Sequence, residues 1–211
     1  MWSLAARDGA RPTADAIRPR LYPQRDERRA VDALLHDFAN GDALVALAPG
    51  SVWATKRWPY YPALAAQATE RGARVVVVGG GADGALAAEI AAACAPGTVL
   101  DATGRLPLLA SAELLGRCAA LVTNDSAPQH LASAMGVPTL TIFGPTVAEF
   151  GFGPLAAGSA TVGHPALACR PCDPHGPAKC PLGHWRCMRE QSPETIGAAL
   201  EALLPVRGRP S

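Results

Sequence analysis

Short apolar runs alternate with longer amphipathic stretches from residue 44 onward. The apolar runs predict strands at 44–48, 74–78, 98–100, 121–123 and 139–143. Apolar residues at helical spacing predict helices at 62–71, 84–95, 107–118, 127–135 and 193–204. Strands and helices that alternate in this way indicate βαβ crossovers. The pattern therefore predicts an α/β fold, a Rossmann-like parallel sheet with helices on both faces.

The two ends of the chain follow other patterns. Residues 1–24 contain prolines and no apolar period, which is typical of a linker. Residues 26–38 have apolar side chains at helical spacing, and an Asn-Gly pair at 40–41 supplies a stop. Regular patterning ends after Pro145. We therefore expect a linker with a helix (1–43), a Rossmann-like domain (44–204) that includes a cysteine-rich segment (164–189), and a tail (205–211).

Composition narrows the class of protein. The formal net charge of the 211 residues is +1, so charge gives no case for nucleic acid as the main partner. No apolar run reaches the roughly 18 residues that cross a bilayer. Residues 1–7 are too short and too soon charged to form a secretory signal. These features predict a cytosolic protein whose six cysteines are thiols or metal ligands.

Ligands of such sheets lie at the carboxyl ends of the strands, so the loops there are candidates for chemistry. The first loop, 48–59, contains a Gly-Ser turn that lets backbone N–H groups approach a ligand closely. Ser51 and Thr55 add hydroxyl donors, and Lys56 and Arg57 add positive charge. This combination suits a phosphate. The alternative is a basic surface loop whose tryptophans pack on the sheet edge.

The second loop matches the dinucleotide-binding pattern G-x-G-x-x-G within Gly79–Gly84. Asp101 lies about 20 residues further on, after another strand, where such sites place an acidic residue. An NAD-binding oxidoreductase domain is therefore an alternative. The pattern alone is weak, because it follows the second strand and leaves the other polar loops without a role. Asp83 in this loop can instead contact the ribose of a nucleotide.

The fourth loop, 123–130, is the most informative. Ser126 suits an N-cap and Pro128 suits the first helical turn. The free N–H groups of that turn, with the positive end of the helix dipole, form an anion site. Asp125 stands at the end of the strand, and we expect His130 to face the crevice. A lone histidine on a helix is usually structural, but these neighbours favour a functional role.

The fifth loop, Phe143-Gly-Pro-Thr146, is a tight turn that we expect beside the same crevice. Thr146 can donate a hydroxyl hydrogen bond there. A plain turn without a functional role is the alternative.

Several segments occur together at a joint spacing: Pro49-Gly-Ser, Thr55-Lys-Arg-Trp-Pro59, Asn124-Asp-Ser with His130, and Phe143-Gly-Pro-Thr146. The tail adds Glu149-Phe-Gly-Phe-Gly-Pro154, Cys169-Arg-Pro-Cys172, Cys180-Pro-Leu-Gly-His184 and Cys187-Met188. Over about residues 44–204, the chain resembles glycosyltransferase family 9, the ADP-heptose:lipopolysaccharide heptosyltransferases. The resemblance implies a GT-B fold of two Rossmann-like domains. This chain would supply the C-terminal domain, which binds ADP-heptose.

The resemblance also implies a role for each matching residue. Lys56 neutralises the diphosphate leaving group and is the expected catalytic residue, with Ser51 and Thr55 beside it. Asp125 bonds to hydroxyls of the donor sugar. The other donor-binding residues are Asp83, Ser126 with the backbone amide of Ala127, His130 and Thr146.

The chain departs from the family pattern in two ways. Family members usually have glycine at the position of Ala127, whose methyl group narrows the approach of the diphosphate. The family's general base and its acceptor site lie in an N-terminal domain that this chain does not match. The resemblance thus implies a cofactor-independent transferase that extends the lipopolysaccharide inner core, cytoplasmic or peripheral at the inner face of the inner membrane. We expect the chain alone to bind ADP weakly and transfer little, and Lys56→Ala to weaken ADP binding without unfolding.

Four cysteines, Cys169, Cys172, Cys180 and Cys187, lie in one short segment. Four thiols in a cytosolic protein are a ligand set for structural zinc. The last two are separated by six residues, which does not match a regular zinc ribbon. Packing of the thiols in a loop-rich flap is the alternative.

Three functional hypotheses follow from the sequence. The chain is an ADP-heptose-type glycosyltransferase (truncated, or half of a split enzyme), a non-catalytic nucleotide-binding module, or an NAD-dependent oxidoreductase domain. A comparison of ADP and NADH binding separates the third hypothesis from the other two.

Overall fold

The computed structural model describes residues 18–39 and 43–204. Six strands form one sheet in the order β3-β2-β1-β4-β5-β6, and all neighbouring pairs are parallel. The strands are β1 (Leu44–Ala48), β2 (Arg74–Val77), β3 (Val99–Asp101), β4 (Ala120–Asn124), β5 (Thr139–Phe143) and β6 (Ala160–Gly163). The order runs outward from β1 in both directions, so the topological switch point lies between β1 and β4.

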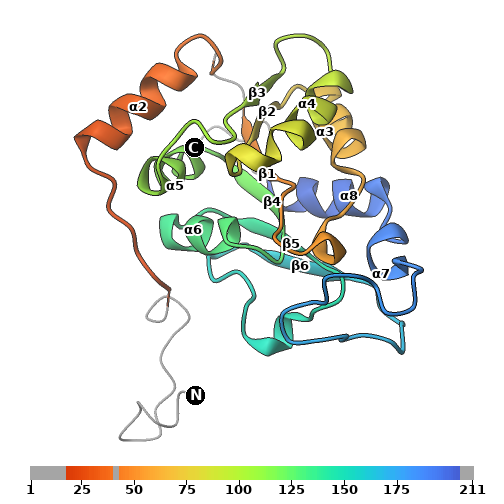
Figure 1. Ribbon diagram of the computed structural model, residues 1–211. Coiled ribbons are helices and arrows are strands. Elements are labelled where there is room, and N and C mark those ends of the chain that lie inside the picture. The colour runs from red at the N-terminus through yellow and green to blue at the C-terminus, as the bar shows by residue number, and fades with distance from the viewer. Residues whose placement is uncertain (1–17, 40–42, 205–211) are drawn as a thin grey trace, which may run out of the picture.

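Helices cover both faces of the sheet (Figure 1), which confirms the predicted α/β class. One face carries α3 (Tyr61–Glu70), α4 (Gly84–Ala92) and α8 (Pro193–Leu203). The other face carries α2 (Arg25–Leu35), α5 (Leu108–Gly116) and α6 (Pro128–Met135). The predicted helices thus lie within a few residues of the observed ones, the usual precision for helix ends.

Alternating side chains of β1 build the two core layers. All five residues of β1 are buried. Val45 and Leu47 pack in the layer that contains Leu64 of α3, whereas Ala46 packs on the opposite side, in the layer that contains Val31 of α2. Successive residues of a strand point to opposite faces, so a strand covered on both sides needs an unbroken apolar run. This requirement explains why β1 was predictable.

Helix α2 belongs to the packed body of the protein. Val31, Leu35 and Phe38 are buried in the layer beneath α5 and α6. The domain boundary predicted after residue 43 assigns this helix to the linker. That boundary remains a prediction. The Asn-Gly pair expected to stop the helix lies outside the described residues, and the helix already ends at Leu35.

The expectation that regular structure ends after Pro145 is wrong in part. Strand β6 pairs with β5 from Ala160 to Gly163, and the short helix α7 covers Arg186–Arg189. Strand β6 is an edge strand that is only partly buried, so it lacks the continuous apolar run of the inner strands. Within the described part of the chain, no helix is long and apolar enough to cross a membrane.

Candidate functional site

Asn124, the last residue of β4, joins the loops on both sides of the switch point. Its side-chain amide donates to the carbonyl oxygen of Pro49 at 2.8 Å. Its side-chain oxygen accepts from the backbone N–H of Trp58 at 3.1 Å. Because Asn124 is fully buried, these bonds hold the loop after β1 at a fixed position beside the loop after β4. The chemistry-bearing residues of both loops therefore meet.

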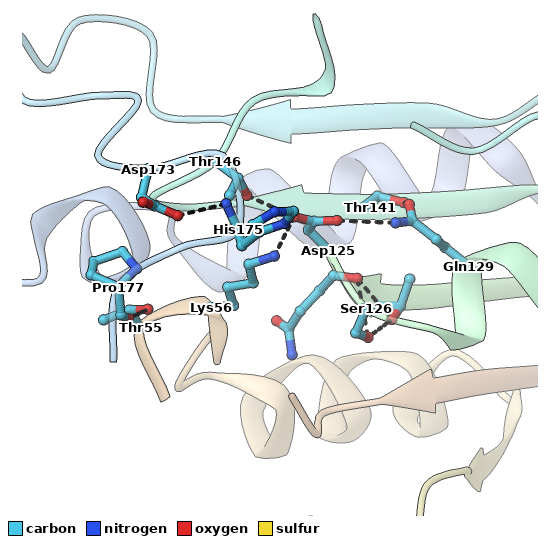
Figure 2. Close-up of polar contacts among 12 residues, drawn as sticks. Thr55, Lys56, Asp125, Ser126, Gln129, Thr141, Thr146, Asp173, His175 and Pro177 are labelled. Atoms are coloured by element: carbon cyan, nitrogen blue, oxygen red, sulfur yellow. Dashed lines mark hydrogen bonds and ion pairs between the residues drawn. The ribbon is translucent and has the colours of Figure 1, made fainter. Parts of the chain in front are cut away.

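A buried polar cluster forms where the loops meet (Figure 2). The Lys56 ammonium lies 2.7 Å from Oδ2 of Asp125, and the Thr146 hydroxyl donates to the same oxygen at 2.8 Å. The side-chain amide of Gln129 donates to Oδ1 of Asp125 at 3.2 Å. The Gln129 oxygen in turn accepts from the Thr141 hydroxyl at 3.0 Å. We call these five residues the Asp125 cluster.

The Asp125 cluster is electrically neutral and nearly closed to solvent. Lys56 is 9% exposed and Asp125 is 8% exposed, while Gln129 and Thr141 are fully buried. A buried charge is tolerated only when it is paired and its remaining hydrogen-bonding positions are satisfied. Both conditions hold for Asp125, whose two oxygens accept three hydrogen bonds from side chains.

Two members of this cluster, Gln129 and Thr141, were not predicted from the sequence. Gln129 lies in the first turn of α6, and its buried side-chain amide reaches back to Asp125 in the preceding loop. The signal in the sequence that could have identified Gln129 was a polar residue on the inward face of a short helix. His130, which was predicted instead, is exposed. Partial burial lowers the pKa of His130, and the negative charge of Asp125 opposes that shift.

A pocket of about 520 Å³ opens beside the Asp125 cluster. Most of its polar lining comes from the loops after β1, β2 and β4, namely Ser51, Arg57, Asp83, Ser126 and Ala127, and Ser111 of α5 adds a hydroxyl. Its apolar wall contains Leu106, Leu108, Leu115 and Leu131. We call this cavity the switch-point pocket. An apolar pocket with a few convergent polar groups at a switch point is where such sheets bind ligands.

The predicted site residues thus divide into two adjoining groups. Ser51, Asp83, Ser126 and Ala127 line the switch-point pocket. Lys56, Asp125 and Thr146 belong to the Asp125 cluster. Thr55 is buried, and its hydroxyl donates to the carbonyl oxygen of Pro177. The chain passes directly from Asp125 in the cluster to Ser126 in the pocket, so the two groups share one loop.

The expected N-cap at Ser126 is wrong. Helix α6 begins at Pro128 with Ala127 as its N-cap, and no side chain caps it. The Ser126 hydroxyl lies 3.2 Å from the Thr123 hydroxyl and 3.4 Å from the Asn124 carbonyl oxygen. Ala127 has φ −53° and ψ −37°, a helical conformation open to any residue. The methyl group at this position therefore causes no backbone strain.

The glycine-rich loop after β2 has a packing explanation that does not need a dinucleotide. An added Cβ at Gly50 would lie 2.4 Å from the Asp83 carboxylate, and one at Gly79 would lie 2.6 Å from it. The Asp83 side chain also accepts from the backbone N–H of Gly80 at 2.9 Å. Moreover, this loop follows β2, whereas the switch point lies beside β1. Gly79 of this loop and Gly50 of the loop after β1 therefore make room for Asp83, whereas an added Cβ at Gly81 or Gly84 would meet no atom closer than 3.7 Å.

The cysteine-rich segment packs over the Asp125 cluster. Gly176 has φ +84°, and a Cβ there would lie 2.9 Å from Cε of Lys56. The ring of the neighbouring His175 lies 6.4 Å from that of Phe152. Figure 2 shows Asp173 and Pro177 on the side of Lys56 away from Gln129. The segment therefore helps to exclude water from the ion pair.

One side chain fastens this segment to the end of β5. The guanidinium of Arg170 donates to four backbone carbonyl oxygens: those of Phe143, Gly144, Thr146 and His164. The Cys172 N–H adds a bond to the Pro145 carbonyl at 2.8 Å. Arg170 thereby also fixes the turn that presents Thr146 to Asp125.

The four cysteines of the segment do not converge as metal ligands in this arrangement. Among the described residues, no three His, Cys, Asp or Glu side chains are placed to hold a metal ion. The Cys169 sulfur lies 3.8 Å from Nε2 of His184, and the Cys172 thiol donates to the Cys169 carbonyl at 3.2 Å. Burial raises the pKa of Cys187 to about 11. The predicted zinc site is therefore not confirmed.

Comparison with known proteins decides the family. The model of glycosyltransferase family 9 (heptosyltransferase) matches residues 13–183. The chain belongs to glycosyltransferase family 9. Lipopolysaccharide heptosyltransferase 2 of Salmonella typhimurium is a family relative, 31% identical over 149 residues, which are 66% of this chain and 43% of that protein. The chain spans less than half the length of the curated relatives it matches.

Solved structures of family 9 enzymes share the fold. The ADP-heptose lipopolysaccharide heptosyltransferase II of Escherichia coli aligns with a TM-score of 0.74 and 24% identity, over 95% of this chain and 59% of that one. The iron-containing dodecameric heptosyltransferase TibC, from enterotoxigenic E. coli and solved with ADP-D-β-D-heptose, aligns with a TM-score of 0.59 and 20% identity. The alignment with TibC covers 77% of this chain and 45% of the TibC chain. These likenesses establish the two-face α/β architecture of the chain.

Proposed function

We propose that this chain is the donor-binding part of a heptosyltransferase that uses ADP-heptose to extend the lipopolysaccharide inner core. Family membership and the donor named for the E. coli relative support this proposal. The observation that carries it is the Lys56–Asp125 ion pair, which joins the two loops at the switch point, beside a pocket of about 520 Å³. The acceptor and its binding domain are part of the proposal.

The chemistry of transfer gives these residues their roles. The bond between C1 of the sugar and the diphosphate oxygen breaks, a bond from C1 to an acceptor hydroxyl oxygen forms, and the hydroxyl proton passes to a base. Negative charge therefore grows on the departing ADP. Positive groups fixed near that oxygen, including Lys56 and the start of α6, would stabilise the transition state more than the bound donor. Asp125 would hold hydroxyls of the sugar.

The pocket lining suits the rest of the donor. The leucine wall would accept the adenine ring, and Asp83 lies on the glycine-rich side, where it can accept from ribose hydroxyls. Direct displacement on a nucleotide sugar requires no redox cofactor. We expect the protein to act in the cytoplasm, with at most peripheral contact at the inner face of the inner membrane.

Calorimetric titration with ADP and with NADH tests the proposal. We expect ADP to bind with a dissociation constant in the micromolar to millimolar range. NADH contains the ADP group, so we expect it to bind no more tightly than ADP does. Absence of ADP binding at millimolar concentration would contradict the proposal, and tighter binding of NADH would favour the oxidoreductase alternative. A non-catalytic module would bind ADP equally well, so binding alone does not distinguish it from a heptosyltransferase. A transfer assay with ADP-heptose, an inner-core acceptor and a supplied acceptor-binding domain separates the two hypotheses.

A structural metal ion in the cysteine-rich segment remains a separate proposal. Its ligands would be Cys169, Cys172, Cys180 and Cys187, and zinc is the expected metal. Binding would require small shifts of the thiols toward a common centre. Metal analysis of protein purified without a histidine tag tests it: about one zinc per chain is expected, and a metal-free protein would rule the site out.

A further inference from the structure

The switch-point pocket contains one cationic side chain among its described lining residues, and that side chain is Arg57. The negative charge of the lining comes from Asp83. A nucleoside diphosphate carries two or more negative charges in the part that would lie near these loops. A pocket that binds it therefore needs a cation with free hydrogen-bond donors.

Lys56 does not meet this need by itself. Its ammonium lies 2.7 Å from Asp125, and the two charges cancel. The pair is buried, and Gly176 packs against the Lys56 side chain. Lys56 can contact a phosphate at the edge of the cluster, but the pair adds no net positive charge to the pocket.

The Arg57 guanidinium is held in place by hydrogen bonds and still has N–H donors without a partner among the described residues. Its Nε and Nη2 atoms both donate to the Ser51 carbonyl oxygen, at 2.9 Å and 2.7 Å. A guanidinium has five N–H donors in a rigid plane, so these bonds fix its orientation and leave about three donors unused. The side chain is exposed, on the same loop as Ser51 and next to the pocket opening.

We propose that Arg57 binds the diphosphate of the nucleotide in the switch-point pocket and is the cation of the pocket lining that contacts it. This inference rests on the proposed function, because it names a further binding residue of the same site. The guanidinium plane matches the spacing of two phosphate oxygens, so bidentate contact is geometrically favoured over a point charge. The bonds to Ser51 tie the arginine to the turn whose N–H groups approach the same phosphates.

Titration of ADP, AMP and adenosine into the full chain tests this role. We expect Arg57→Gln to weaken ADP binding about 10- to 100-fold, the usual effect of losing hydrogen bonds to a charged group. The loss for AMP should be smaller, and adenosine binding should not change. Arg57→Lys should recover part of the ADP affinity, because it keeps the charge and loses the bidentate geometry. The dependence of ADP affinity on salt should also become shallower in Arg57→Gln.

Arg105→Gln is the matched control. Arg105 is also exposed and donates to a backbone carbonyl, that of Asp101, but it does not line the pocket. Its substitution should leave ADP binding unchanged. If the wild-type chain binds ADP and Arg57→Gln binds it equally well, the assignment of Arg57 is overturned while the proposed function stands. If Arg57→Gln weakens adenosine as much as ADP, Arg57 acts by shaping the loop, which also overturns the assignment. If the wild-type chain binds no ADP, the proposed function itself fails.

Discussion

The Asp125 cluster and the switch-point pocket adjoin each other but use polar groups in opposite ways. In the cluster, Lys56, Gln129 and Thr146 all direct their donors to one buried carboxylate. In the pocket, Arg57 uses two of its N–H donors on the Ser51 carbonyl oxygen and keeps about three unused. A saturated network stabilises a fixed geometry, whereas unused donors are available to a ligand. The fold thus places a saturated polar network next to a pocket whose arginine has unused donors.

This difference predicts that substitutions in the cluster change stability first and binding second, whereas substitutions in the pocket do the reverse. The two effects can be separated because unfolding and ligand binding are measured independently.

Removal of Lys56 should produce the largest effect. Lys56→Met leaves the Asp125 carboxylate buried without its counter-ion, which typically costs about 3–5 kcal/mol of unfolding free energy. Lys56→Ala should show a similar loss, so its effect on ADP binding must be measured on protein shown to be folded. Urea unfolding followed by circular dichroism measures the change.

Two further variants check that the loss arises from the unpaired charge. Adding Asp125→Asn to Lys56→Met should recover part of the stability, because the uncompensated charge is then gone. The Arg71–Glu201 pair has the same N–O distance, 2.7 Å, but its side chains are 60% and 50% exposed. Arg71→Gln should therefore cost no more than about 1 kcal/mol. Equal losses for Lys56→Met and Arg71→Gln would show that burial does not distinguish the two pairs.

Gln129→Leu should have an intermediate effect. It removes one hydrogen bond to Asp125 and leaves the buried Thr141 hydroxyl without its acceptor, at a cost of about 1–3 kcal/mol. Because Thr141→Val removes the stranded hydroxyl, the double variant should be destabilised by less than the sum of the two single changes. Strict additivity in urea unfolding would contradict a shared network.

His130 should show the smallest effect. The pKa of His130 is lowered in the folded protein, so the unfolded chain binds more protons once the pH falls below the ordinary value near 6.5. The folded state therefore loses stability between that value and the lower folded pKa, by less than about 1 kcal/mol for this exposed residue. His130→Gln should remove this part of the pH dependence. An NMR titration that placed the pKa of His130 above 6.5 would contradict the expectation.

The regular framework was predictable because its signals are local. The inner strand β1 is buried on both faces and appears as an unbroken apolar run. The equally buried β5 also contains Thr139 and Thr141, whose hydroxyls have hydrogen-bond partners. Strand β6 was missed because an edge strand with partly exposed residues needs no such run. The meeting of the carboxyl-end loops could be predicted because a parallel sheet brings them to one edge.

The polar partnerships were not predictable from spacing. The sequence places Lys56 and Asp125 on neighbouring loops, but it does not show that they neutralise each other. Both Lys56 and Arg57 were read as positive charge suited to a phosphate, but only Lys56 was assigned a role, although Arg57 is the one that lines the pocket. Likewise, His130 was chosen for its chemistry, although its neighbour Gln129 occupies the inward face of α6. Which side chain turns inward depends on the exact start of the helix, and that start was misplaced by one residue.

The anchorage of the cysteine-rich segment through Arg170 has an evolutionary consequence. The guanidinium recognises four peptide oxygens, and every amino acid offers such an oxygen whatever its side chain. Mutations around the anchor can therefore alter the chemistry of the covering loop while its docking position stays the same. One arginine at this position would let the side chains of the covering loop change, metal-binding or not, above an unchanged Asp125 cluster.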